Sequence, residues 1–165
     1  MTTTAPRPAP VAQANPNITT VHATWCGARK YEVGRQGEPT IIIDGSRSEA
    51  PGPVDVLLGA LATCSAMDVV DFLEKRRTPP DALNVVVVAE RRAAAPRRVL
   101  NATLAYHVTG ASVESVHAER AITLAIENYC SVASSLASDI VLHTQLVLNG
   151  EPHSVVRQRA AMVAT

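Results

Sequence analysis

The feature that most constrains the fold is a long apolar segment that begins at Pro53 and ends near Arg77. Its apolar residues recur at positions 57, 58, 61, 64, 69, 70 and 73, which is helical spacing. Proline suits the first turn of a helix, and Thr78-Pro79-Pro80 stops it. Because residues 57–66 are almost all apolar or small, the sequence predicts a buried helix.

This helix carries Cys64 near its middle, and a second cysteine, Cys130, follows later in the chain. Free cysteines are often only packing residues, so each could be purely structural. A third cysteine, Cys26, follows Trp25 and is expected to be structural or an exposed bystander. No cysteine spacing resembles CxxC or a zinc site, and the five histidines lack ligand spacing. The sequence therefore predicts no metal site.

Short β-branched segments lie on both sides of the long helix. Strands are expected at 20–25, 30–33, 39–45, 83–90, 99–108 and 140–148. A second helix is expected from Ser112 or Ser115 to Tyr129, and a short third helix over 132–137. This order predicts an α+β fold with antiparallel sheets.

The chain is long enough for one domain with a sizeable core. Residues 1–16 are rich in Thr, Pro and Ala, and we expect a disordered or loosely ordered tail there. The domain is expected over 17–150, followed by a C-terminal tail over 151–165. Only 3% of residues are aromatic, so a partner subunit is expected to help cover the long apolar helix.

Charge and composition exclude several classes of function. The net charge is zero, which argues against binding to nucleic acid or to an anionic membrane surface. No run of 18 apolar residues and no apolar leader is present, so the sequence predicts no membrane span and a cytoplasmic location. No glycine-rich phosphate loop follows a strand, and no cofactor is expected.

Two motifs carry a resemblance to a known family. Residues 52–70, GPVDVLLGALATCSAMDVV, resemble the hallmark helix of the OsmC/Ohr family, the osmotically inducible and organic-hydroperoxide-resistance thiol peroxidases. Residues 129–136, YCSVASSL, resemble its second cysteine motif, and residues 24–27 fit its opening strand. The residues of these motifs resemble the general OsmC-like branch more than the organic-hydroperoxide-resistance branch. The resemblance covers about residues 20–150 and implies an OsmC-like fold in an intertwined homodimer with active sites at the subunit interface.

The resemblance also implies a chemistry for the two cysteines. Cys64 matches the peroxidatic residue, whose thiolate attacks the O–O bond of a hydroperoxide and becomes a sulfenic acid. Cys130 matches the resolving residue, which forms a disulfide with Cys64. An external dithiol, in this family a lipoylated protein or a small dithiol, then reduces that disulfide. Because a free thiol has a pKa of ~8.5 and Cys64 lies in mid-helix, its activation requires a cation.

Two arginines are candidates for that cation. In the family the arginine stands in a Gly-Arg-x-Gly-like context, which Gly34-Arg35-Gln36-Gly37 fits. Arg47, in the loop before the helix, is the competitor. An arginine in a turn is commonly only solvated, so the sequence leaves this choice open.

The carboxylate that orients the arginine is a further candidate. Asp55 stands two residues after Pro53, whereas the peroxidase branch carries Glu directly after the proline, where this chain has Val54. Glu49 is an alternative. Nine helical residues place Asp55 and Cys64 on opposite faces and ~13 Å apart along the axis. Either the helix starts after Asp55, or the carboxylate comes from the other subunit.

Two functions follow from these observations. The cysteine pair favours a thiol-dependent peroxidase that reduces organic hydroperoxides or hydrogen peroxide. The departure at Val54 favours the alternative, a dimeric OsmC-like protein that binds a small apolar ligand or senses redox state without efficient turnover.

Overall fold

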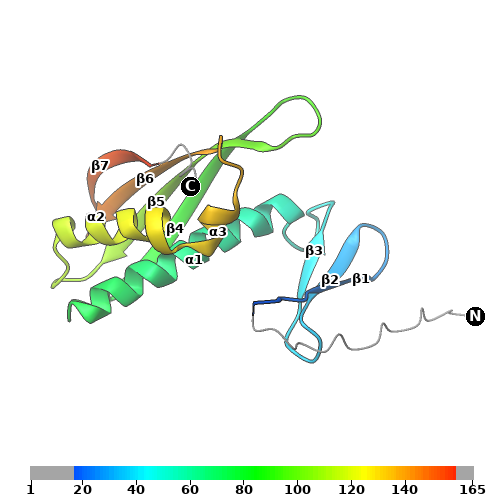
Figure 1. Cartoon of the computed structure of the whole chain (residues 1–165), viewed down its shortest axis with the longest axis horizontal. Helices are drawn as coiled ribbons and strands as arrows, with labels where there is room; N and C mark the ends of the chain where they lie inside the picture. The colour runs from blue at the N-terminus through cyan, green and yellow to red at the C-terminus, as the bar shows by residue number, and fades with distance from the viewer. Residues whose placement is uncertain (1–16, 159–165) are drawn as a thin grey trace, which may run out of the picture. The chain divides into compact units, whose positions relative to one another are not determined.

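The computed structural model describes residues 17–158, which form an α+β chain (Figure 1). The chain divides into two compact units, one up to Val56 and one from Leu57. The expected tail over 1–16 and the end of the expected C-terminal tail, 159–165, lie outside the described residues.

The N-terminal unit is a three-stranded antiparallel meander. Its strands are β1 (His22–Trp25), β2 (Lys30–Gly34) and β3 (Ile41–Asp44), in that order, as the sequence predicts. Trp25 pairs with Tyr31, which in turn pairs with Ile43. These β-branched and aromatic residues favour a sheet, and Gly37, with a φ of 80°, allows the turn between β2 and β3.

The apolar side chains of this meander are largely exposed within the single chain. Trp25 is 63% exposed, and Tyr31, Ile41 and Ile42 are exposed as well. The buried residue of the three strands is Asp44, whose carboxylate accepts hydrogen bonds from the amide of Ser46 and the hydroxyl of Ser48. These bonds hold the pKa of Asp44 well below its usual range and fix the loop before the long helix.

The long helix that the sequence predicts is confirmed as α1 (Pro53–Lys75). In the single chain its burial is one-sided. The buried stripe consists of Leu61, Ala62, Ser65, Val69 and Leu73, and its spacing is that of one helix face.

The opposite side of α1 is open, and it includes the apolar side chains of Leu57 and Met67. By length and composition alone, α1 could cross a membrane. The core helix of a soluble protein passes the same test, and α1 carries Asp55, Asp68 and Asp71. The helix therefore does not by itself point to a membrane protein.

The second sheet has four strands in the order β4-β5-β6-β7. These are β4 (Ala82–Arg91), β5 (Val99–Thr109), β6 (Val141–Leu148) and β7 (Glu151–Gln158). β5 and β6 run parallel, so the prediction of antiparallel pairing throughout is wrong at this pair. The helices between β5 and β6 return the chain to the end of the sheet where β5 begins, and such a crossover produces a parallel pair. β7 falls where the sequence predicts only a tail.

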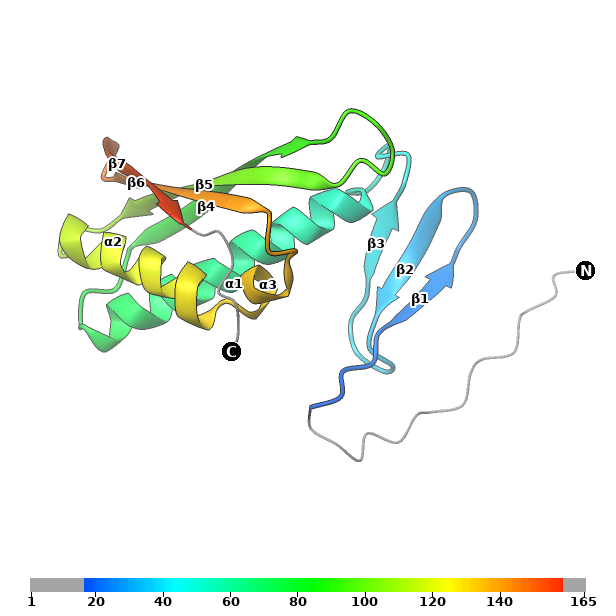
Figure 2. The same cartoon turned by 45° about the horizontal axis from the view of Figure 1, so that its top comes forward.

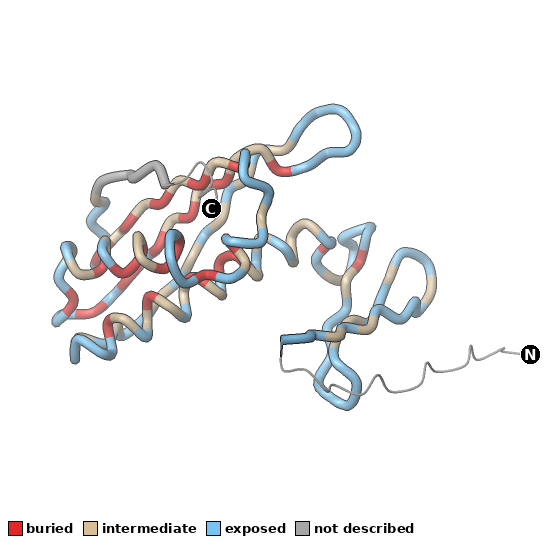
Figure 3. Tube along the Cα trace, viewed as in Figure 1, coloured by how far each residue is buried: buried red, intermediate tan, exposed pale blue. Residues whose placement is uncertain are grey.

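Helices cover one face of this sheet. The second predicted helix is present as α2 (Ser115–Leu124), continued by a π-helical turn, η1 (Ala125–Tyr129), and a short helix, α3 (Ser131–Ser135), follows. In Figures 1 and 2, α1 and α2 lie on the same side of the sheet. β5 and β6 alternate between buried and less buried residues, and Figure 3 shows buried residues at intervals along the sheet strands and along the helices.

Candidate functional site

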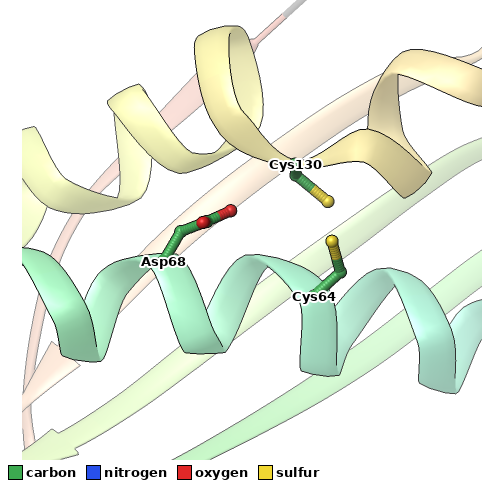
Figure 4. Close-up of side chains that lie close together, drawn as sticks. All are labelled: Cys64, Asp68 and Cys130. Atoms are coloured by element: carbon green, nitrogen blue, oxygen red, sulfur yellow. The ribbon is translucent and has the colours of Figure 1, made fainter. Parts of the chain in front are cut away.

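Two thiols and a carboxyl group come together between α1 and the start of α3. Cys64 and Asp68 are four residues apart on α1 and therefore lie on the same helix face. Cys130 approaches them from the junction of η1 and α3 (Figure 4). The two sulfur atoms and a carboxyl oxygen of Asp68 all lie within 4.8 Å of one another. The structure thus brings the two predicted cysteines together.

The π-helical turn sets the position of Cys130. Its amide donates to the carbonyl of Ala125, five residues earlier, at 2.8 Å. Cys130 then leaves the helix in an extended conformation and caps α3, where its sulfur accepts a hydrogen bond from the amide of Ala133 at 3.3 Å. Single π-helical turns occur often at functional sites, because they redirect one side chain within an otherwise regular helix.

A buried hydrogen bond fixes the register of α1 next to Cys64. The hydroxyl of Tyr106, on β5, donates to the hydroxyl of Ser65 at 2.7 Å, and Ser65 donates to the carbonyl of Leu61 at 2.9 Å. Tyr106 and Ser65 are both fully buried. Burial raises the pKa of Tyr106 well above its ordinary value, so the phenol keeps the proton that it donates.

The surroundings of Cys130 favour its protonated form. Burial raises the pKa of Cys130 to about 11, and the amide of Ala133 opposes this only in part. A side-chain hydrogen bond to Cys64 and the charge of Cys64 are smaller causes that contribute to the same rise. Cys130 is therefore a neutral thiol at pH 7.

The carboxyl group of Asp68 lies in surroundings that leave part of its hydrogen-bonding capacity unused. Burial, followed by the charge of Asp71, raises the pKa of its carboxyl group, and Lys75 opposes this shift. Its Oδ2 atom is buried and has no hydrogen-bond partner among the described residues. A buried acceptor without a donor is costly, which suggests that Asp68 serves a purpose other than packing.

The three side chains also raise the question of a metal ion. Sulfur and carboxylate oxygen are atoms that zinc accepts, but a structural zinc site normally has four protein ligands. Burial raises the pKa of both Cys130 and Asp68, which works against placing several negative charges here to bind a metal. The arrangement fits thiol and proton chemistry better, and we assign no metal to it.

A second group of predicted residues lies within the N-terminal unit. The Nε atom of Arg47 lies 2.7 Å from Oδ2 of Asp55, and its Nη2 atom donates to Oδ1 at 2.9 Å. The carboxylate of Asp55 also accepts a hydrogen bond from the amide of Gly52 at 2.9 Å. This two-point pairing fixes the guanidinium group as a single hydrogen bond would not. Arg47 has a φ of 57°, an uncommon conformation for a residue with a side chain.

The other candidates stand apart from this pair. Asp55 is paired with Arg47 rather than with Arg35, which lies exposed in the turn after β2. Glu49 forms an ion pair with Lys30 instead. Cys26 is exposed beyond the end of β1.

Sequence reasoning missed three residues of the site. Asp68 is marked only by its place four residues after Cys64, a spacing that any helix face offers. Tyr106 lies on the buried face of β5, whose residues alternate between buried and less buried, and a buried hydroxyl requires a hydrogen-bond partner. Ser65 is that partner, although in sequence it resembles any small helical residue.

Fold and site together define a class: an α+β protein with a thiol pair between a long core helix and a capped helix start. The sequence pattern of the OsmC-like protein family matches residues 45–145. The chain therefore belongs to the OsmC-like family. Protein YhfA of Escherichia coli strain K12 is 40% identical to it over 97 residues, which cover 58% of this chain and 72% of YhfA.

Solved structures share the fold. An OsmC-like protein from Mycoplasma pneumoniae matches with a TM-score of 0.70 and 13% identity, over 81% of this chain and 99% of that one. An organic hydroperoxide resistance protein OsmC from Legionella pneumophila matches with a TM-score of 0.58 and 14% identity, over 80% and 98% of the chains. At these identities the likeness concerns the fold alone.

Proposed function

We propose that this protein is a thiol-dependent peroxidase that reduces organic hydroperoxides or hydrogen peroxide. The observation that carries the proposal is the pairing of Cys64 with a buried Cys130 at a sulfur separation of at most 4.8 Å. Two sulfurs this close need only small adjustments to reach the bond length of a disulfide, ~2 Å. The two cysteine motifs, which resemble those of the thiol peroxidases of the OsmC/Ohr family, support the same chemistry.

The reaction assigns different roles to the two thiols. The Cys64 thiolate attacks the terminal peroxide oxygen, the O–O bond breaks, and the alcohol leaves after taking up a proton. Cys64 is then a sulfenic acid. Cys130 attacks its sulfur, releases water and forms the disulfide. A dithiol, either small or carried by a lipoylated protein, reduces this disulfide and restores both thiols. Such turnover suits a reducing, cytoplasmic environment.

The cation that activates Cys64 is proposed to be Arg47, held by Asp55. The two-point ion pair supports this choice over Arg35, because a guanidinium must be fixed to stabilise a thiolate. α1 begins at Pro53, so the helix does not start after Asp55. We therefore propose that the pair serves Cys64 of a second subunit in a homodimer.

Thiol counting tests the proposal. Reduced protein is mixed with an equal amount of cumene hydroperoxide, and the remaining free thiols are counted. The wild type should lose two thiols per chain and form a Cys64–Cys130 disulfide. Cys64→Ser should lose none, and Cys130→Ser should give a sulfenic acid that dimedone traps. Cys26→Ser is the matched control and should behave as the wild type, because Cys26 is exposed outside the pair.

The same measurement separates the two candidate functions. A protein that keeps all its thiols at stoichiometric peroxide is no peroxidase, which would favour the ligand-binding alternative. A protein that forms the disulfide but is not reduced again by dihydrolipoamide or dithiothreitol is a redox sensor without turnover.

A further inference from the structure

Asp68 is the one member of the thiol cluster that the proposed reaction leaves without a role. It lies on α1, one helical turn beyond Cys64, and its side chain extends toward the space where the two sulfurs meet (Figure 4). A carboxyl oxygen lies within 4.8 Å of both sulfurs, and Oδ2 is buried without a partner among residues 17–158. An unsatisfied acceptor next to a thiol is placed to receive that thiol's proton.

The chemistry of disulfide formation requires such an acceptor. Cys130 must attack as a thiolate, yet it is fully buried and holds its proton at neutral pH. The hydroxide that leaves the Cys64 sulfenic acid must in turn gain a proton. One group that takes a proton from Cys130 and gives it to the leaving oxygen would serve both ends of the reaction.

We propose that Asp68 is the proton acceptor for Cys130 in the step that forms the disulfide. The Asp68 carboxylate takes the Cys130 proton while the Cys130 sulfur bonds to the Cys64 sulfur and the S–O bond of Cys64 breaks. Asp68 then gives that proton to the departing hydroxide, which leaves as water. Electrons and protons balance within the cluster, and no outside reagent is required.

The groups around Asp68 are consistent with this role. Asp71 and Lys75, on α1 itself, act on it with opposite signs. The charge of Asp68 acts on Tyr106 of β5, which remains a phenol that donates to Ser65. Cys130 approaches Asp68 from the η1–α3 junction, within 4.8 Å. Among the described residues, no lysine, arginine or histidine forms an ion pair with Asp68 that would prevent it from accepting a proton.

This inference rests on the proposed function, but it can be tested without peroxide. In a Cys26→Ser background, 5,5′-dithiobis(2-nitrobenzoate) forms a mixed disulfide at Cys64 and releases one thionitrobenzoate. Attack by Cys130 then releases a second, and stopped-flow absorbance follows both phases. Asp68→Asn should leave the first phase within about threefold of the parent and slow the second by about 10²-fold or more.

Two further variants separate proton transfer from structure. Asp68→Glu keeps the carboxylate and should restore most of the second-phase rate. Asp71→Asn, three residues on and exposed, is the matched control and should leave it within about twofold. A second phase in Asp68→Asn as fast as in the parent would overturn the proposal, as would an equal slowing of both phases.

The pH profile gives a readout that a structural role would not affect. Between pH 7 and 10 the second phase of the parent should change little, because Cys130 passes its proton to Asp68 and need not ionise on its own. In Asp68→Asn it should rise about tenfold per pH unit as Cys130 ionises unaided. The same tenfold rise in the parent would show that Cys130 needs no acceptor, and would contradict the proposal even if the variant failed to fold. Failure with peroxide alone would count against the peroxidase and not against Asp68.

Discussion

At the scale of single residues, the burial of Cys130 links the chemistry of the site to the stability of the protein. The pKa of its thiol rises from 9.0 to about 11 on folding. Between these values the unfolded chain loses the thiol proton while the folded chain keeps it, so unfolding releases a proton. The free energy of unfolding contributed by this group is fully present below pH 9 and falls as the pH rises from 9 to 11.

Urea denaturation at several pH values checks this expectation. The stability of the wild type should fall faster between pH 9 and 11 than that of Cys130→Ala, by up to roughly 1 kcal/mol per pH unit. The other ionisable groups are the same in both proteins, so their contributions cancel in the difference. Parallel curves for the two proteins would show that burial does not hold the Cys130 proton.

The Tyr106–Ser65 hydrogen bond allows a second prediction, because removing either partner has a different cost. Ser65→Ala leaves a buried tyrosine hydroxyl without a partner and should cost about 1–3 kcal/mol of stability. Tyr106→Phe removes the hydroxyl itself, while Ser65 keeps its bond to Leu61, and should cost about 0.5–1.5 kcal/mol. The double variant should be close to Tyr106→Phe alone. Urea unfolding of the four proteins measures this, and additive costs would contradict it.

The sequence carries the two cysteines of the site but not the residues around them. Cys64 and Cys130 stand in motifs that can be recognised by their neighbours in sequence. Asp68 and Tyr106 belong to the site because α1, β5 and the start of α3 pack close together, and local sequence patterns do not encode that packing. Which arginine pairs with Asp55 likewise depends on the path of the loop before α1, and in the structure it is Arg47.

At the scale of elements, hydrophobic periodicity was a good guide to α1, β4, β5 and β6, but not to β7, which it left in the tail. The pattern over residues 53–77 predicted α1 within two residues at its C-terminus. The parallel pairing of β5 with β6 could not be read in this way, because the direction of a strand depends on the path of its connection. The π-helical turn before Cys130 was also hidden, since its sequence is compatible with an ordinary helix.

The loop that enters α1 carries a prediction of its own. If Arg47 activates Cys64, Arg47→Ala should lower kcat/KM for cumene hydroperoxide by about 10²–10³-fold, as expected for the loss of one fixed charge at a reacting centre. The ion pair is partly exposed, so stability should change by less than about 1 kcal/mol. Arg35→Ala is the matched control and should retain activity within about twofold. The reverse ranking of the two variants would assign the role to Arg35.

At the scale of the whole molecule, each unit leaves apolar surface uncovered in the single chain. In the N-terminal unit, Trp25, Tyr31 and Ile41 are exposed on a three-stranded sheet. In the C-terminal unit, Leu57 and Met67 are exposed on α1. Apolar surface of this kind marks an interface, and a second copy of the chain is the occupant that we propose.

A charge on the open face of α1 tests that assembly. Met67 is 67% exposed in the single chain, so Met67→Asp should be harmless to an isolated monomer. If a second subunit covers this face, the aspartate would be buried without a partner, and the dimer should dissociate at micromolar concentration. Analytical ultracentrifugation and the concentration dependence of Tm measure this.

Val88→Asp is the matched control for this experiment. Val88 is equally exposed at 67%, but it lies on the outward-facing side of β4. The same charge there should leave the sedimentation coefficient of the wild type unchanged. Because the proposed arginine comes from the second subunit, Met67→Asp should also lose peroxidase activity in parallel with dimer dissociation. A monomeric Met67→Asp protein with full activity would show that each chain holds a complete site, and the arginine would then have to come from the same chain as Cys64.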